Sequence, residues 1–137
     1  MGQGHAGLAK WHEYMMGGAD PAVLSDLLAD NAVFHSPVVH TPQAGKAIVM
    51  AYLVAASHTL GNDSFHYVRE LVDGDDVMLE FVTVMDGITV NGVDIIRFNP
   101  DGKITDFKVM VRPLKAINKV WEMMAAQLQA AKAQPAA

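Results

Sequence analysis

Apolar residues recur at helical spacing in three segments of the first sixty residues. The first segment covers residues 8–16 and stops at two glycines. The second follows Asp20-Pro21, a helix cap and a proline suited to the first helical position, and buries residues 23–28. A short strand is predicted at 32–36, and the third helical pattern covers residues 48–56. The chain therefore opens with three short amphipathic helices and one strand.

From residue 64 to residue 112 the apolar positions alternate as they do in strands. Turn signals at 73–75, 86–87 and 99–102 divide this stretch into four consecutive antiparallel strands. Pro113 ends the last strand because proline cannot continue the ladder. A closing helix follows, with an apolar stripe made of Leu114, Ile117, Trp121, Met124 and Leu128.

Helices grouped first and a strand meander afterwards are typical of an α+β domain. We expect one domain over residues 1–137, with helices packed on one face of a curved antiparallel sheet. The ends, residues 1–7 and 132–137, show no packing pattern and are predicted to be flexible. A sheet that curls around helices tends to leave a pocket.

Composition restricts the classes of function. The chain has 137 residues, no cysteine, and 10 Lys plus Arg against 15 Asp plus Glu, a formal net charge of -5. Thiolate chemistry and disulfides are therefore excluded, and an acidic surface disfavours nucleic acid and anionic membranes as partners. No apolar run is long enough for a membrane span and no signal-peptide pattern opens the chain, so we expect a cytoplasmic protein with a small hydrophobic ligand.

One acid lies among large apolar residues in the third long strand. Alternation places Asp94, Ile96 and Phe98 on the same face. Burial disfavours the ionised form of a carboxyl group, so the pKa of Asp94 should rise, which suits a neutral hydrogen-bond donor or a proton carrier. The alternative is a structural acid, bonded to the backbone or to a cross-strand cation near Asn91-Gly92.

The order of elements and the run Gly92-Val93-Asp94-Ile95-Ile96-Arg97-Phe98-Asn99-Pro100-Asp101-Gly102-Lys103-Ile104 resemble the SnoaL-like branch of the nuclear transport factor 2 superfamily, over residues 8–113. The branch includes ketosteroid isomerase and limonene epoxide hydrolase. The resemblance implies a cone-shaped α+β roll of the cystatin-like type, with three helices packed in a curved antiparallel sheet plus a C-terminal helix. It also implies a deep apolar pocket and a homodimer. Isomerases, cyclases, hydrolases and binding modules all use this scaffold, so the fold does not define the function.

The resemblance assigns roles to individual positions. Asp94 stands where ketosteroid isomerase has the protonated aspartate of its oxyanion hole. His12 stands at the place of the oxyanion-hole tyrosine, and Ser36 at that of the general-base aspartate. Val109 replaces a catalytic acid of limonene epoxide hydrolase. Because an unactivated hydroxyl cannot remove a proton from carbon at neutral pH, Ser36 weakens the case for steroid isomerisation.

His40, in the loop after the first strand, is a candidate replacement for the missing base, since histidine titrates near neutrality. The alternative is a solvated loop residue. His35 and His40 lack a carboxylate as third ligand, so no metal is expected, and no cofactor is implied.

The resemblance also implies a set of ligand-binding residues. Tyr52 matches an aromatic pocket position of the family, and other residues face inward if Asp94 does. The expected ligand-binding residues are Phe34, Ser36, Tyr52, Ile96, Phe107, Val109 and Val111. The alternative is a closed core without a cavity, because apolar stripes are usually core.

Our hypothesis is a pocket for a small hydrophobic or polyketide-like molecule. If the protein is an enzyme, it is an isomerase or cyclase in which Asp94, His12 and His40 move protons or stabilise an enolate. The rival hypothesis is a non-catalytic ligand-binding or dimerisation module, which the replacements at Ser36 and Val109 favour.

Overall fold

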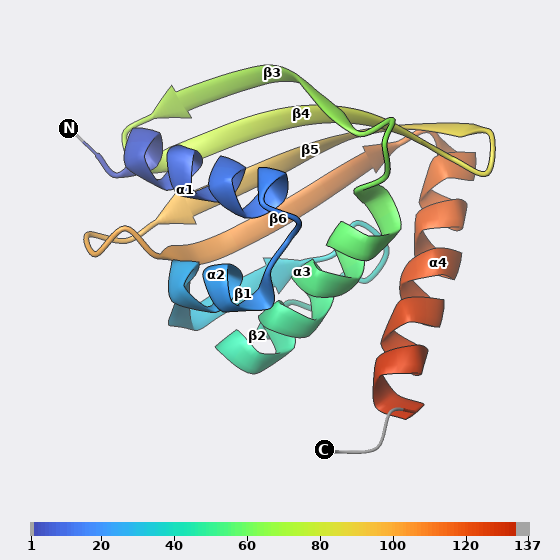
Figure 1. Ribbon diagram of the computed structural model, residues 1–137, viewed down its shortest axis with the longest axis horizontal. Helices are drawn as coiled ribbons and strands as arrows, with labels where there is room; N and C mark the ends of the chain where they lie inside the picture. Colours follow the sequence, from blue (N-terminus) through green and yellow to red (C-terminus); the bar gives the residue numbers. More distant parts are fainter. Residues whose placement is uncertain (1, 134–137) are drawn as a thin grey trace.

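Four helices and a six-stranded sheet make up residues 2–133, the part of the chain that this computed structural model describes (Figure 1). Both the helix-first order and the later meander agree with the sequence pattern. In chain order the elements are α1 (Gly4–Met16), α2 (Pro21–Leu27), β1 (Leu28–His35), β2 (Gln43–Ala44), α3 (Lys46–Leu60), β3 (His66–Asp73), β4 (Asp76–Met85), β5 (Ile88–Phe98), β6 (Ile104–Arg112) and α4 (Leu114–Ala133).

The sheet has the strand order β2-β1-β6-β5-β4-β3. Strands β3 to β6 form the predicted antiparallel meander, and Gly74, Gly87 and Gly102 adopt positive φ angles in its three turns. The expectation of a wholly antiparallel sheet is wrong at one place, because β1 lies parallel to β6. Hydrophobic alternation specifies which face of a strand is buried but not the direction of its neighbour, so the sequence pattern could not reveal this pairing.

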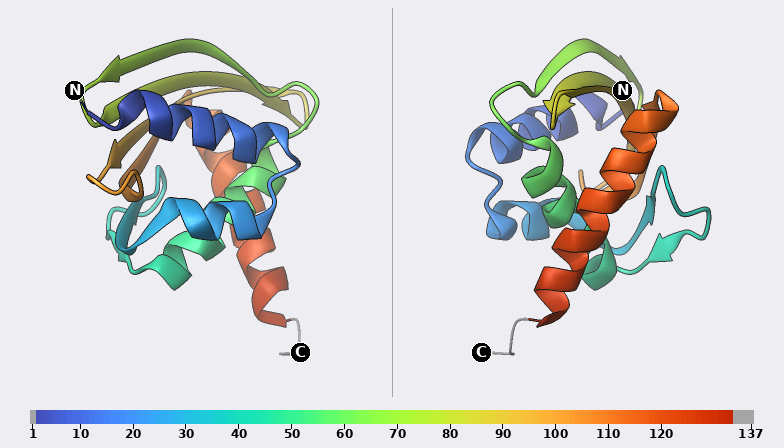
Figure 2. Two further views of the ribbon diagram at one scale, coloured as in Figure 1. Left: turned by 60° about the vertical axis from the view of Figure 1, so that its left-hand side comes forward. Right: turned by 90° about the vertical axis from the view of Figure 1, so that its right-hand side faces the viewer.

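The sheet curves around the helices, so that its concave face becomes the interior. Figure 1 shows α1 lying along β3, β4 and β5, and α4 beside α3 near the far end of the sheet. The two turned views in Figure 2 agree that α3 and α4 lie against each other on the concave side of the sheet. Apolar residues of all these elements meet in one core, so the concave face is covered by helices except where they leave a cavity.

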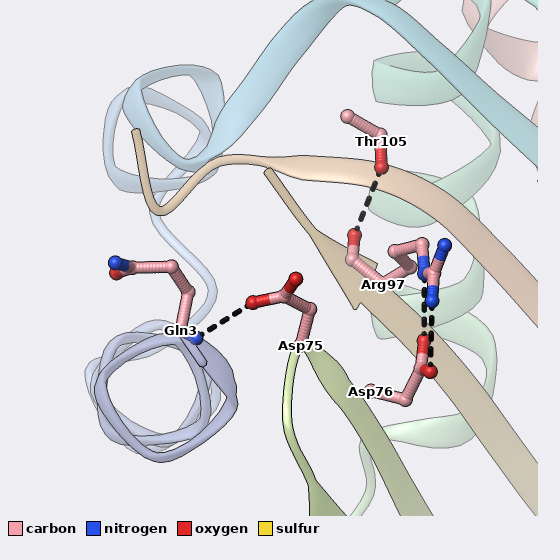
Figure 3. Close-up of polar contacts among 5 residues, drawn as sticks. All are labelled: Gln3, Asp75, Asp76, Arg97 and Thr105. Atoms are coloured by element: carbon pink, nitrogen blue, oxygen red, sulfur yellow. Dashed lines mark hydrogen bonds and ion pairs between the residues drawn. The ribbon is translucent and has the colours of Figure 1, made fainter. Parts of the chain in front are cut away.

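The N-terminal segment is attached to the turn between β3 and β4. Residues 4–7, predicted to be flexible, are instead the first turns of α1. The N–H of Gln3 donates a hydrogen bond of 2.8 Å to Oδ1 of Asp75 (Figure 3). A contact between residues so far apart in sequence leaves no local signal, which explains the wrong expectation. At the other end, where residues 132–137 were expected to be flexible, residues 132 and 133 are the last two residues of the closing helix α4, and residues 134–137 lie outside the described part of the chain.

The same end of the sheet is held by contacts between neighbouring strands (Figure 3). Arg97 of β5 donates two hydrogen bonds to the carboxylate of Asp76 on β4, at 2.9 and 3.1 Å. The hydroxyl of Thr105 on β6 donates to the carbonyl oxygen of Arg97 at 3.3 Å. The ion pair lowers the pKa of Asp76. Both partners are largely exposed, so the pair contributes little to stability.

Two helices show how far periodicity predicts local structure. The cap of α2 is confirmed, because the side chain of Asp20 accepts a hydrogen bond of 3.0 Å from the N–H of Ala22.

The predicted stripe of α4 is wrong in part: Leu114 and Trp121 are 71% and 59% exposed. The buried residues of α4 are Ala116, Val120 and Met124. The helix carries apolar residues on more than one side, so its contacts with α3 and the sheet decide which side is buried.

Two glycines let large rings approach the backbone. A Cβ atom at Gly7 of α1 would overlap the ring of Phe98, and one at Gly92 of β5 would overlap the ring of Phe81. The absence of a side chain at Gly7 therefore sets the close approach of α1 to β5. At Gly92 it allows the Phe81 ring to lie over the strand.

We predict that Gly7→Ala destabilises the fold even though alanine is the better helix former. Introducing a methyl group into this packed contact should cost about 1–3 kcal/mol. Chemical denaturation of the purified variant measures the change. Ala6→Gly, at the exposed neighbouring position, gives the ordinary helix-propensity difference of about 1 kcal/mol. A Gly7→Ala protein as stable as the native one would contradict the proposed packing role.

Candidate functional site

An apolar cavity of about 50 Å³ lies between the concave face of the sheet and helices α1, α3 and α4. Its wall is mainly aromatic and aliphatic. Five of the residues expected from the sequence line it together with Asp94: Phe34, Ser36, Phe107, Val109 and Val111. The cavity has room for a few water molecules or for one end of a ligand.

Asp94 occupies the middle of this concave face. It lies opposite Leu79 of β4 and Val109 of β6, both buried, and is itself 7% exposed. The alternation predicted for β5 is therefore confirmed. Among residues 2–129, whose side chains are described, no N–H group or other side chain is hydrogen-bonded to its carboxyl group, which excludes for this region the structural acid tied to a cation. Burial without a partner raises the pKa of Asp94 from 3.8 to about 8.

Tyr67 of β3 faces the same cavity. Its hydroxyl oxygen accepts a hydrogen bond of 2.9 Å from Nε1 of Trp11, which also lines the cavity. An indole N–H can only donate, so the proton of the Tyr67 hydroxyl is left free to donate elsewhere. Burial, and next the charge of Asp94, raise the pKa of Tyr67, so the hydroxyl stays protonated at neutral pH.

Two hydroxyl groups form a hydrogen bond between α1 and α3. The hydroxyl groups of Tyr14 and Ser57 are 2.9 Å apart, and Ser57 donates to the carbonyl oxygen of Leu53 at 2.9 Å. Because the proton of Ser57 is used in that bond, Tyr14 is the donor in the pair. Burial raises the pKa of Tyr14, so this buried phenol also remains neutral. Ser57 is also one of the residues that line the cavity.

Ser36 lies at the cavity wall as expected, at the end of β1. Its oxygen accepts a hydrogen bond of 3.1 Å from the N–H of Val38. Neither a histidine nor a carboxylate is bonded to it within the described residues. The hydroxyl is therefore not activated, which agrees with the expectation that Ser36 cannot serve as a base.

His12 does not lie at the cavity. Its Nε2 atom is 2.7 Å from Oε1 of Glu70, and its ring contacts the edge of Tyr67 from outside. Successive residues of a helix point about 100° apart, so when Trp11 faces the interior His12 must face the flank. The structure therefore brings Trp11, rather than His12, next to Asp94 and Tyr67.

Three more candidate residues lie away from Asp94. His40 is exposed and lines a separate groove, so it is not positioned as a base for the cavity. Tyr52 stacks on the cavity residue Phe34, with ring centroids 5.3 Å apart, and so supports the wall from behind. Ile96 is fully buried in the core. Ile96 shares the inward face of Asp94, but helix packing fills the space over it.

Sequence reasoning missed Tyr67 for a definite reason. Counted from the turn at Gly74, simple alternation would send Val68 inward and Tyr67 outward. A bulge between Tyr67 and Arg69 shifts the register, so that Tyr67 pairs with the inward-facing Phe81 and Val68 is exposed. One extra residue in β3 therefore decides that the Tyr67 side chain faces the cavity rather than the opposite side of the sheet.

No trio of histidine, aspartate or glutamate side chains able to hold a metal ion occurs among residues 2–133. None of the described helices is long and apolar enough to cross a membrane.

Fold and cavity together define a small α+β domain in which a curved sheet and its helices enclose an apolar site with a buried acid. The chain belongs to the SnoaL-like domain family, which matches residues 8–107. The resemblance in the sequence is thereby confirmed. No curated protein matches the chain.

Solved structures show the same relationship. A steroid delta-isomerase from Pseudomonas aeruginosa is 37% identical, with a TM-score of 0.90 over 98% of this chain and 97% of that one. A conserved bacterial protein with a cystatin-like fold, from Silicibacter pomeroyi, is 30% identical, with a TM-score of 0.81 over 90% and 85%. A putative polyketide cyclase from Sinorhizobium meliloti is 19% identical, with a TM-score of 0.59 over 74% and 94%, and shares the fold.

We predict that the buried carboxyl group of Asp94 makes the stability of the protein fall as the pH rises. Between pH 4 and about 8 the unfolded chain has lost the Asp94 proton while the folded chain retains it, so raising the pH favours unfolding. Asp94→Asn removes this titrating group. The free energy of unfolding of the variant, relative to that of the native protein, should therefore rise with increasing pH by at most about 1.4 kcal/mol per pH unit.

Urea denaturation at several pH values across this range measures the difference. Asp63→Asn, a change at an exposed aspartate, serves as the control and should shift stability equally at all pH values. A pH-independent difference for Asp94→Asn would contradict the raised pKa.

Proposed function

We propose that the protein binds a small hydrophobic ketone in this cavity and stabilises its enolate form, as an isomerase or cyclase acting by proton transfer. The carrying observation is the buried, unpartnered carboxyl group of Asp94 in the same apolar cavity as the free O–H of Tyr67. Both groups are neutral donors near neutral pH, which is the state that can donate hydrogen bonds to a ligand oxygen.

The surroundings favour an oxygen that gains negative charge during the reaction. Donors that are already oriented in a dry site stabilise a developing oxyanion more strongly than water does. Trp11 orients Tyr67, and the rings of Trp11 and Phe107, with centroids 5.1 Å apart, help to exclude water. An apolar ketone would replace the few waters that the cavity can hold.

The similar protein from Pseudomonas aeruginosa supports the proposal, because it is described as a steroid delta-isomerase. In such an isomerisation, a proton leaves a carbon next to the carbonyl and a proton is added at another carbon, so the ligand keeps its composition. Asp94 keeps its own proton in the role proposed here and donates only a hydrogen bond. The carrier of the migrating proton is then a water molecule or a basic group of the ligand, since Ser36 is not a base.

A second candidate is ligand binding without turnover. One observation favours it: among the residues that line the cavity, Asp94 and Tyr67 are the ionisable ones, and both are held in the neutral form. A site made of donors binds a carbonyl or phenol oxygen whether or not a base is present.

We predict that 2-naphthol binds more tightly than naphthalene, because its oxygen meets the two donors. Asp94→Leu and Tyr67→Phe should each weaken naphthol binding about tenfold without weakening naphthalene binding, as expected for one lost hydrogen bond in a buried site, because neither replacement side chain can donate. Titration with Trp121→Phe as the background isolates the fluorescence of Trp11, the other tryptophan of the chain. Asp63→Asn is the control, and equal affinities for naphthol and naphthalene would refute the donor site.

Turnover separates the two candidate functions. We predict that the native protein converts androst-5-ene-3,17-dione to its conjugated isomer, seen by ultraviolet absorbance, and exchanges the α-hydrogens of 4-phenylcyclohexanone in D₂O, seen by NMR. Asp94→Leu, which leaves no donor at this position, should lower kcat about 10²–10³-fold, the usual effect of removing an oxyanion donor. Naphthol binding that depends on Asp94, with neither product nor exchange, would instead establish a non-catalytic binding protein.

A further inference from the structure

A groove of about 540 Å³ opens where β1 ends and β6 continues. His35, the last residue of β1, pairs in parallel with Lys108, so residues 109–112 of β6 extend beyond β1. Residues 36–42 form the opposite wall. The groove is therefore built by two segments that the fold requires to lie side by side, rather than by a single loop.

The groove is basic in a chain whose net charge is -5. Lys108 and His40 line it, and among the side chains described, those of residues 2–129, neither has an ion-pair or hydrogen-bond partner. The nearest acid in register is Asp106, whose Oδ1 is 2.8 Å from Nε2 of His35. Asp106 also lies opposite Arg97 in the sheet register, on the strand next to β6.

The groove adjoins the cavity. Ser36, Pro37, Val109 and Val111 line both. A ligand pocket typically occupies about 300–1,000 Å³, whereas the cavity beside Asp94 has about 50 Å³. A ligand whose carbonyl group reaches Asp94 must therefore extend outward along a neighbouring surface.

The other neighbouring depression, beside His12, is less suited to this extension. It also shares lining residues with the cavity, and two of them, Phe65 and Tyr67, pack edge to face between the two spaces, with ring centroids 5.1 Å apart. Its residue His12 is paired with Glu70, whose carboxylate would repel an anion. The groove at Lys108 instead contains a positive charge, which attracts an anion.

We propose that this groove is the outer half of the ligand site and takes a carboxylate, with Lys108 as the charge partner and His40 as a hydrogen-bond donor. This inference rests on the proposed function, because it assigns the other end of the same ligand to the cavity. The ligand class is then a hydrophobic keto acid, with the ketone oxygen at Asp94 and the acid group at the surface. Apolar contacts with Val109 and Val111 cover the middle of the ligand.

Two matched probes test this assignment: 4-(4-oxocyclohexyl)benzoic acid and its primary amide, which differ in charge alone at the distal end. At low salt the native protein should bind the acid about threefold to tenfold more tightly, the size expected for a partly exposed ion pair. Lys108→Gln should abolish this preference and leave amide affinity unchanged. Lys10→Gln, which removes the same charge from an exposed position of α1, should preserve it. Added salt should reduce the preference in the native protein.

The outcomes separate this inference from the proposed function. Equal affinity for the two probes in the native protein, or a preference that persists in Lys108→Gln, overturns the carboxylate site while amide binding that weakens in Asp94→Leu upholds the cavity. Failure of both probes to bind, or binding unaffected by Asp94→Leu, contradicts the cavity assignment and the groove assignment together.

Discussion

Burial of one carboxyl group on the central strand β5 governs the chemistry of this protein. Asp94 lies between Leu79 and Val109 on a face that is otherwise apolar, so water cannot solvate its charged form. Its pKa consequently rises to about 8. The same desolvation that costs the fold stability above pH 4 keeps a proton available for hydrogen bonding in the interior.

The remaining parts of the domain maintain this environment. Gly92 lets the ring of Phe81 lie across β5, next to Asp94 along the strand. Helix α1 brings Trp11 onto Tyr67, and α4 closes the cavity with Val120 and Met124. A donor-rich, narrow cavity combined with an adjoining basic groove is the chemical basis of both proposals.

Much of the fold followed from local pattern. The alternation in β5 and the glycine turns of the meander predicted four strands and the inward direction of Asp94, because strand period and turn geometry are properties of a few adjacent residues. Helix position was also predictable, but helix phase was not. His12 and Trp11 are neighbours on one amphipathic turn, and only the packing of α1 on β5 decides which of them faces inward. The phase of α4 was wrong for the same reason.

The sequence by itself determined an α+β chain with one acid on an apolar strand face, and it placed Ser36, Phe34, Phe107 and two valines beside that acid. Only the tertiary structure decided that β1 runs parallel to β6, that His40 lies in a separate groove, and that Tyr67 faces the cavity. Each of these depends on contacts between residues far apart in the chain. A one-residue bulge in β3 reverses the side of Tyr67, and no local periodicity records such a shift.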